Sequence, residues 1–252
     1  NKRRLSNFIK NKRGLYSFWI FFVLFLISLF ADFIANEKPL LIKYENEFYY
    51  PILQSYSETT FGGDFETEAD YRDPFVKNLI NSSGWMIMPI IPYKYNTIIR
   101  DIDSPAPSPP SRKNLLGTDD QARDVLSRLI YGFRISILFG FTLTFFSMII
   151  GVSAGAIQGY FGGKTDLFFQ RFMEIWSAIP TLYILIILAS VIQPNFWWLL
   201  IILLLFSWMG YVGVVRAEFL RARNFDYIRA AKALGVSTTK IIFRHMIPNA
   251  TV

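Results

Sequence analysis

The chain has 252 residues, of which 52% are hydrophobic and 18% are charged, and its formal net charge is +7. It contains no cysteine, which excludes a disulfide scaffold, and its hydrophobic content excludes disorder over most of its length. Residues 135–163 and 175–215 contain no charged side chain. A helix needs about 20 apolar residues to cross a bilayer, so we predict an all-α polytopic membrane protein.

Residues 1–17 form a basic N-terminus without an acidic side chain. An apolar run over 18–35 follows, interrupted only by Asp32, and a helix of this length crosses the hydrocarbon. A cleaved signal peptide has a similar pattern, but the aromatic core and the lack of a small-residue cleavage site favour a retained transmembrane helix 1. The basic flank predicts a cytoplasmic N-terminus.

Residues 36–114 are polar and more acidic than basic, so we predict a periplasmic segment inserted between spans 1 and 2. The mixture of aliphatic, aromatic and polar residues over 40–53 indicates short strands, and the glycines at 62–63 indicate a turn. The proline-rich stretch 104–111 is typical of an extended polyproline linker, which either positions the segment or is a plain spacer.

The pattern over 115–132 predicts a helix that lies at the membrane surface before the chain enters the bilayer. Thr118 is a good N-cap residue, and Gln121 follows at the spacing of a capping box. Asp119 and Asp120 complement the positive end of such a helix. We therefore expect the interfacial helix to begin at Thr118.

Transmembrane helices 2–4 are predicted within 133–215, at about 133–158, 172–192 and 196–215, with a turn at 193–195. Pro180 allows a kink in the third span, either static or part of a gate. Counting crossings from a cytoplasmic N-terminus places 216–252 inside, where basic residues outnumber acidic ones. The lipid bilayer thus explains much of the positive charge, and no nucleic-acid partner is needed.

The residues that enzymes use are scarce in this chain. His245 is the single histidine, and the stretch 159–165 resembles a phosphate loop but has Gln158 where that loop needs its first glycine. We predict no catalytic residue, no cofactor-binding residue and no metal site. Because the predicted spans also lack buried charge, a transported solute would need energy from a partner protein.

Small residues recur every four positions on the second span, at Ser147, Gly151, Gly155 and Gly159. Such a stripe lets another helix approach closely, so we predict helix packing for the three glycines. A pore-lining role for the same face stays open.

The segment 216–252 has the pattern of a helix–turn–helix. Residues 218–234 favour a helix, Gly235 is a typical C′ residue, and Ser237 is a typical N-cap of a second helix that ends at Pro248. Three interpretations fit: a rigid element that docks into a partner, a solvated loop, or a polybasic segment that binds lipid.

The order Arg229-Ala230-Ala231-x3-Gly235, followed by Ile247-Pro248, resembles the EAA loop of ABC importer permeases. Arg229 stands in place of the usual Glu, and Ile247 in place of the usual Leu. Residues 116–129 and 171–180 are similar to segments of the dipeptide and oligopeptide permeases. Residues 56–63, 69–74 and 107–112 resemble the YejE-type group of oligopeptide and microcin C importers.

The resemblance implies the type I fold of binding-protein-dependent permeases in the bacterial inner membrane. Two spans follow the EAA loop in that family, so the chain is expected to be truncated before helices 5–6. The implied partners are a second permease subunit (YejB-like), an ABC ATPase (YejF-like), a periplasmic substrate-binding protein (YejA-like) and a peptide substrate. The implied ATPase-coupling residues are Arg229, Ala230, Ala231, Gly235, Ile247 and Pro248.

The permease itself would hydrolyse nothing. Two other functions remain open from the residues alone: a membrane receptor or scaffold that acts through 36–114, and an intramembrane enzyme that uses His245 or the acidic residues of that segment.

Overall fold

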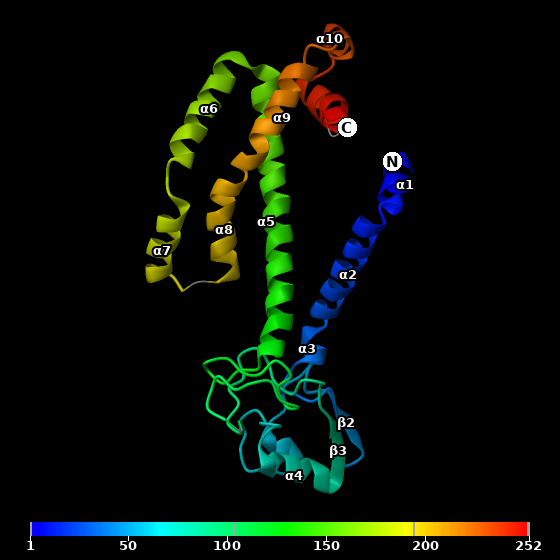
Figure 1. Ribbon diagram of the computed structural model, residues 1–252, viewed down its shortest axis with the longest axis vertical. Coiled ribbons are helices and arrows are strands. Elements are labelled where there is room, and N and C mark those ends of the chain that lie inside the picture. Colours follow the sequence, from blue (N-terminus) through cyan, green and yellow to red (C-terminus); the bar gives the residue numbers. More distant parts are fainter. Residues whose placement is uncertain (1, 103, 194, 251–252) are drawn as a thin grey trace. The chain divides into compact units, whose positions relative to one another are not determined.

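The computed structural model describes residues 2–102, 104–193 and 195–250, and Figure 1 labels its helices and strands. The chain forms two compact units, which divide between Ile137 and Leu138. Residue 1 of the predicted basic N-terminus, Pro194 of the predicted turn and residues 251–252 of the predicted coupling loop lie outside the described residues.

The first unit begins with helices α1 (Lys2–Lys10), α2 (Lys12–Leu29) and α3 (Ala31–Ile34). The Asn11 side chain caps α2 by accepting a hydrogen bond of 3.2 Å from the Gly14 amide. The predicted first span at 18–35 therefore lies on two helices, because the chain bends at Phe30. α2 is long and apolar enough to cross a membrane.

The predicted all-α fold class does not hold for the segment after α3, which contains a three-stranded antiparallel sheet in the order β2-β1-β3. β1 (Leu41–Tyr44) and β2 (Glu47–Tyr49) confirm the strands expected within 40–53. A third strand that was not predicted, β3 (Gly84–Ile87), pairs with β1 and follows the helix α4 (Pro74–Ser83).

One face of this sheet carries the hydrophobic core of the segment. Ile42 of β1 lies opposite Tyr49 of β2 and Met86 of β3, so these side chains share a face. That face packs with Phe61, at the end of the short 3-10 helix η1 (Glu58–Phe61), and with the buried stripe of α4, which consists of Val76 and Ile80. A small α/β segment therefore lies between the first two apolar helices, α2 and α5, along the chain.

A polar cluster attaches α3 to the helix α5 (Val125–Phe161). The Tyr131 hydroxyl donates to Asp32 Oδ1 at 2.7 Å, and Arg134 Nη1 donates to Asp32 Oδ2 at 2.8 Å. The Arg134 guanidinium also lies over the Tyr131 ring, 4.9 Å from its centroid. Asp32, the one charge in the first apolar run, is thus neutralised by an ion pair rather than left alone.

The predicted start of the interfacial helix at 115–132 is wrong. Residues 115–124 form turns, and α5 begins at Val125. The Thr118 hydroxyl accepts from the Ser108 amide at 2.9 Å instead of capping a helix. Asp124 takes the capping role: its Oδ1 accepts from the Ser127 amide at 2.7 Å, and Asn114 Nδ2 donates to its Oδ2 at 2.8 Å. The Ser108 contact also shows that the proline-rich stretch is not a free spacer.

No break separates the predicted interfacial helix from the predicted second span. α5 has 37 residues and is about 55 Å long, which exceeds the hydrocarbon thickness of about 30 Å. The same helix therefore contains the end of the first unit and the start of the second.

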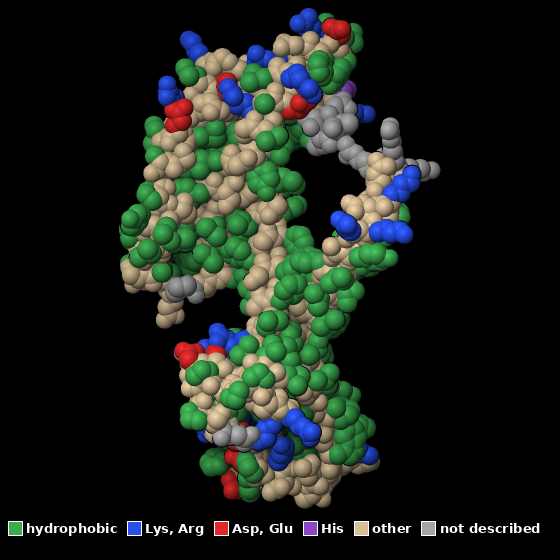
Figure 2. Space-filling view, viewed as in Figure 1, with side chains coloured by type: hydrophobic (Ala, Val, Ile, Leu, Met, Phe, Trp, Pro, Cys, Tyr) green, Lys and Arg blue, Asp and Glu red, His purple; other side chains and the backbone are tan. Residues whose placement is uncertain are grey.

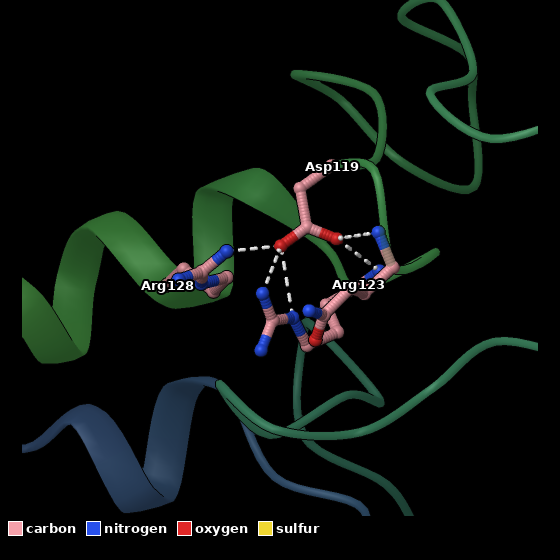
Figure 3. Close-up of polar contacts among 4 residues, drawn as sticks. Asp119, Arg123 and Arg128 are labelled. Atoms are coloured by element: carbon pink, nitrogen blue, oxygen red, sulfur yellow. Dashed lines mark hydrogen bonds and ion pairs between the residues drawn. The ribbon is translucent and has the colours of Figure 1, made fainter.

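Asp119 organises the turn before α5 (Figure 3). Its Oδ1 accepts from the amides of Gln121 and Arg123, both at 2.9 Å, and its Oδ2 accepts from Arg123 Nε at 2.8 Å and pairs with Arg128. Burial alone would raise the pKa of Asp119, but these hydrogen bonds outweigh it and lower the pKa to about 2. The carboxylate is therefore a half-buried, turn-forming group rather than a charge at a helix start.

We expect this carboxylate to make the stability of the chain depend on acid pH. The folded-state pKa lies below the ordinary value of 3.8, so the stabilisation is present above about pH 4 and is lost as the pH falls towards 2. The loss is about 1–2 kcal/mol, reduced because Arg128 is partly solvated. Unfolding of the detergent-solubilised chain at pH 6 and pH 3 measures it.

Asp119→Asn should reduce the difference between the stability at pH 6 and the stability at pH 3. Asp120→Asn, which replaces an exposed neighbour, should leave that difference unchanged. Equal behaviour of the two variants would contradict the role assigned to Asp119.

The second unit continues α5 and contains shorter helices. Their bounds are α6 (Gly163–Ser177), α7 (Thr181–Val191), α8 (Phe196–Ser207), α9 (Met209–Ala222), α10 (Asp226–Ala233), α11 (Thr238–Lys240), the π-helix η2 (Ile241–Met246) and α12 (Ile247–Ala250). α6 and α7 meet at a bend of 58°, at the position of Pro180. The kink expected there is present.

In the described part of the chain, three helical segments are long and apolar enough to cross a membrane: α2, α5 and the stretch Phe196–Ala222. The bent pair of α6 and α7 makes a fourth if it counts as one span. Apolar side chains cover much of the visible surface of these helices, and charged side chains gather beyond their ends (Figure 2). The arrangement agrees with four predicted spans, although α9 continues to Ala222 instead of ending near 215.

Candidate coupling site

The glycine stripe, defined as Gly151, Gly155 and Gly159 of α5, lies against α9. A Cβ atom built on Gly151 would be 2.4 Å from the Trp208 carbonyl oxygen, and one on Gly159 would be 2.4 Å from the Cβ of Phe219. Gly140, earlier on the same helix, has no heavy atom within 4 Å of such a position. The stripe is therefore covered by the backbone of α9, and the two helices run side by side (Figure 1).

The chain after α9 folds into an elbow, which we define as residues 223–247. Ile228 of α10 and Ile241 and Met246 of η2 are buried together with Phe219 and Ala222 of α9. Ala156 and Tyr160 of α5 complete this cluster. The elbow consequently has a hydrophobic core of its own, built on the same pair of helices that meet at the glycine stripe.

The end of α10 has the geometry of a Schellman cap. The Gly235 amide donates to the Lys232 carbonyl at 3.0 Å, and the Val236 amide donates to the Ala231 carbonyl at 3.1 Å. Gly235 has φ +75°, a left-handed conformation that glycine adopts without steric cost. Its place as the C′ residue agrees with the expectation from the sequence.

Two boundaries of the elbow differ from prediction. Residues 218–234 are not one helix, because α9 ends at Ala222 and a turn precedes α10. Because of this turn, the chain reverses and Ile228 packs in the same core as Phe219. A continuous helix would carry Ile228 away from that core. The second helix also does not end at Pro248: η2 widens the helical turn, and α12 then includes this proline in its first turn, where a missing amide donor is tolerated.

The predicted coupling residues separate into two groups. Arg229, Ala230 and Gly235 are exposed, whereas Ala231 and Ile247 are partly buried against the elbow core. Pro248 is exposed on α12. The described residues include no ion-pair partner for the Arg229 side chain, which stands where the EAA pattern has an acid. The exposed side of α10 thus combines small side chains with a free guanidinium.

Leu234 is the residue on this surface that the analysis of the sequence did not single out. Its side chain is 83% exposed, next to Gly235 and one helical turn after Ala230. Leu234 therefore adds apolar area to the exposed side of α10, beside the small side chains there. Spacings of three and four residues along 218–234 include Leu234 but do not show that its side chain is exposed.

A second missed feature is an ion pair between α6 and α9. Arg216 Nε donates to Asp166 Oδ1 at 2.5 Å, and Arg216 Nη2 donates to Asp166 Oδ2 at 2.6 Å. This bidentate pair holds the beginning of α6 against α9 within the unit that carries the elbow. Opposite charges at the ends of consecutive predicted spans were the available signal.

We expect Asp166→Asn to lower the stability of the chain by about 1–3 kcal/mol, because it replaces two charge-assisted hydrogen bonds of a partly buried guanidinium. Thermal unfolding followed by size-exclusion chromatography in detergent measures the effect. Glu174→Gln is the matched control, since its pair with Arg171 is exposed and contributes little. A similar shift for both variants would refute the structural importance of the buried pair.

Comparisons with known proteins agree with this geometry. A family model described as the binding-protein-dependent transport system inner membrane component matches residues 147–252, and the N-terminal TM domain of oligopeptide transport permease C matches residues 2–54. The inner membrane ABC transporter permease protein YejE of Escherichia coli is 56% identical over the whole chain, which covers 74% of that relative. The chain belongs to the YejE-type ABC importer permeases.

Further relatives support the assignment. The peptidoglycan transport system permease protein YejE of Agrobacterium fabrum is 53% identical over the whole chain, which covers 72% of that relative. The oligopeptide transport system permease protein OppC of Haemophilus influenzae is 37% identical over 69% of the chain and 55% of its own length. As a YejE-type permease, the chain is a multi-pass inner-membrane subunit, and ATP hydrolysis belongs to a separate ATPase subunit.

Membership of this family also implies a second permease and a substrate-binding protein as partners. The intramembrane-enzyme interpretation is excluded by the same finding, since these permeases are transport subunits and not enzymes.

Proposed function

We propose that this permease imports oligopeptides, with the exposed side of the elbow as the contact for its ATPase. The peptide class is supported by the names of the OppC relatives and by the family model that matches the N-terminal segment. Peptide–nucleotide antibiotics of the microcin C type and peptide-bearing fragments of peptidoglycan, which the Agrobacterium relative's name suggests, belong to the same proposal.

One observation carries the coupling proposal: the elbow is packed against α9 on its inner side and exposes a large apolar side chain on its outer side. Ile228 is fully buried in the core shared with α9, while Leu234, six residues later, is 83% exposed. Because α10 packs against α9 in this core, a force applied to the exposed side of α10 displaces α9 as well. A solvated loop or a lipid-binding segment needs neither the core nor the cap.

Charge supports a cytoplasmic location for the elbow and the N-terminus. The first acidic residue of the chain is Asp32, after a basic N-terminus, and the elbow carries Arg223, Arg229, Lys232, Lys240 and Arg244. In this topology residues 36–124 lie in the periplasm between spans 1 and 2, and the chain takes the type I permease fold. The YejB-like, YejF-like and YejA-like proteins are the proposed second permease, ATPase and binding protein.

Site-directed crosslinking tests this function, since the chain has no native cysteine. In the assembled importer, Ala230→Cys and Leu234→Cys should crosslink to the ATPase subunit, with a yield that changes by about threefold or more on adding ATP. Gln193→Cys, which lies in the predicted turn on the periplasmic side, is the matched control and should not crosslink.

Absence of an ATPase crosslink at both elbow positions, in an importer that still takes up peptide, would refute the docking surface. A receptor or scaffold that acts through residues 36–114 predicts instead that elbow substitutions leave function unchanged, and family membership does not favour it.

A further inference from the structure

The segment between α3 and α5 contains a cleft of about 910 Å³ that the transport mechanism above does not use. The first turns of α4 form one side, and the chain that follows β3 forms the other. Small-molecule sites typically have volumes of about 300–1,000 Å³, so a short peptide fits this space. The lining contains both basic and acidic side chains.

The positive charges of the cleft are available to a ligand. Arg72, Lys77 and Arg100 line it, and none of them forms an ion pair with any residue that the structure describes. Arg72 is oriented by the ring of Tyr93, whose centroid is 5.2 Å from the guanidinium carbon. Because no described carboxylate lies within ion-pair distance of these three cations, their donors can bind an anionic group from outside.

The carboxylates of the cleft, in contrast, are already engaged. Asp70 accepts from the Arg72 amide at 2.9 Å, and Asp73 caps α4 by accepting from the Phe75 amide at 2.8 Å. Glu37 accepts from the Thr97 hydroxyl at 2.7 Å, and Asp101 pairs with Lys113 at 3.8 Å. Each of these four carboxylates is thus held by at least one contact within the chain, whereas no ion pair with a described residue holds the three cations.

Tyr93 adds a neutral donor to the lining. Its side chain is only 7% exposed and lines the cleft, yet its hydroxyl has no hydrogen-bond partner among the described residues. Burial, together with the charge of Asp101, raises the pKa of Tyr93, so this hydroxyl keeps its proton at neutral pH. The Tyr93 hydroxyl is therefore a donor that a ligand in the cleft can use.

Apolar side chains complete the lining. Ile90 is 86% exposed and Ile98 is 60% exposed, both at the edge of the cleft beside the cations. We propose that this cleft binds the terminal carboxylate of a short peptide through Arg72, Lys77, Arg100 and the Tyr93 hydroxyl, with an apolar peptide side chain against Ile90 and Ile98. The choice of a peptide as the carrier of the carboxylate rests on the proposed function.

Two ligands that differ only at the carboxylate test the proposal: the tripeptide Ala-Ala-Leu and its C-terminal amide. Calorimetric titration into the assembled, detergent-solubilised importer should give an affinity for the acid that is at least about tenfold higher than for the amide. Combining Arg72→Gln, Lys77→Gln and Arg100→Gln should remove this preference. Arg112→Gln, an exposed cation of the same segment outside the cleft, should keep it.

Tyr93→Phe changes no charge and deletes only the hydroxyl, so it should weaken binding of the acid about threefold or more even if the triple variant does not fold. Equal binding of acid and amide by the unsubstituted importer would overturn the proposal, as would an unchanged preference in the triple variant. Peptide uptake measured in parallel separates the proposal for the cleft from the proposed import function. Normal uptake without a preference for the acid would refute the binding site in the cleft and leave the import function intact.

Discussion

Gly235→Asp abolishes peptide uptake while the permease remains folded in the membrane; this is the largest functional effect that we expect. A Cβ at Gly235 would meet no heavy atom within 4 Å, so the new side chain extends from the exposed side of the elbow. Aspartate tolerates the left-handed conformation better than most residues, and the folding cost is about 1 kcal/mol. A carboxylate buried without a partner against the ATPase costs several kcal/mol more, which is a loss of about 100-fold or more in productive contact.

Gly235→Asn is the matched control, because asparagine has the same size and the same tolerance for positive φ but no charge. Uptake of a radiolabelled tripeptide by vesicles, together with the amount of ATPase that co-purifies, measures both variants. We expect partial uptake for Gly235→Asn and almost none for Gly235→Asp. If both variants transported normally, the exposed side of α10 would not be the docking surface.

Gly159→Leu gives the largest structural effect that we expect. The Cβ position at Gly159 lies 2.4 Å from the Cβ of Phe219 and 2.6 Å from the Arg216 carbonyl oxygen, so α9 must move before any side chain fits. Overpacking of this kind costs about 3 kcal/mol or more where backbone atoms must shift. Thermal unfolding in detergent should show the loss, and uptake should fall with it.

Gly140→Leu places the same side chain on the same helix where nothing lies within 4 Å, and it should change stability by less than about 0.5 kcal/mol. The pair of variants separates a general effect of a larger residue in α5 from the specific contact with α9. A loss of similar size at both positions would show that the glycine stripe is not a tight helix interface.

These two predictions share a physical element. Phe219 contacts the glycine stripe through its Cβ, and its side chain is buried in the elbow core with Ile228. α9 therefore connects the elbow to α5 without a flexible segment between the two contacts. A displacement of the elbow by a nucleotide-driven ATPase would reach α5 through this helix, and the Arg216–Asp166 pair would carry it to α6.

The turn at 115–124 shows where local sequence patterns are insufficient. Thr118 and Gln121 have the spacing of a capping box, and in a short peptide that pattern would favour a helix start. In the folded chain the Thr118 hydroxyl bonds to Ser108, and buried Asp124 receives donors from Asn114 and Ser127. Asn114 and Ser108 precede the pattern by several residues, so the competition between two caps could not be judged from the pattern alone.

Hydropathy and charge were enough to predict a multi-pass membrane protein, its apolar segments, the glycine stripe and the capped turn at Gly235. Each of these depends on neighbours within one or two helical turns, and bilayer thickness converts apolar length directly into a span. Only the tertiary structure decided the sheet between the first two spans, the start of α5, the Asp166–Arg216 pair and which coupling residues face outwards. These features arise from contacts between residues far apart in the chain, whose partners no local periodicity identifies.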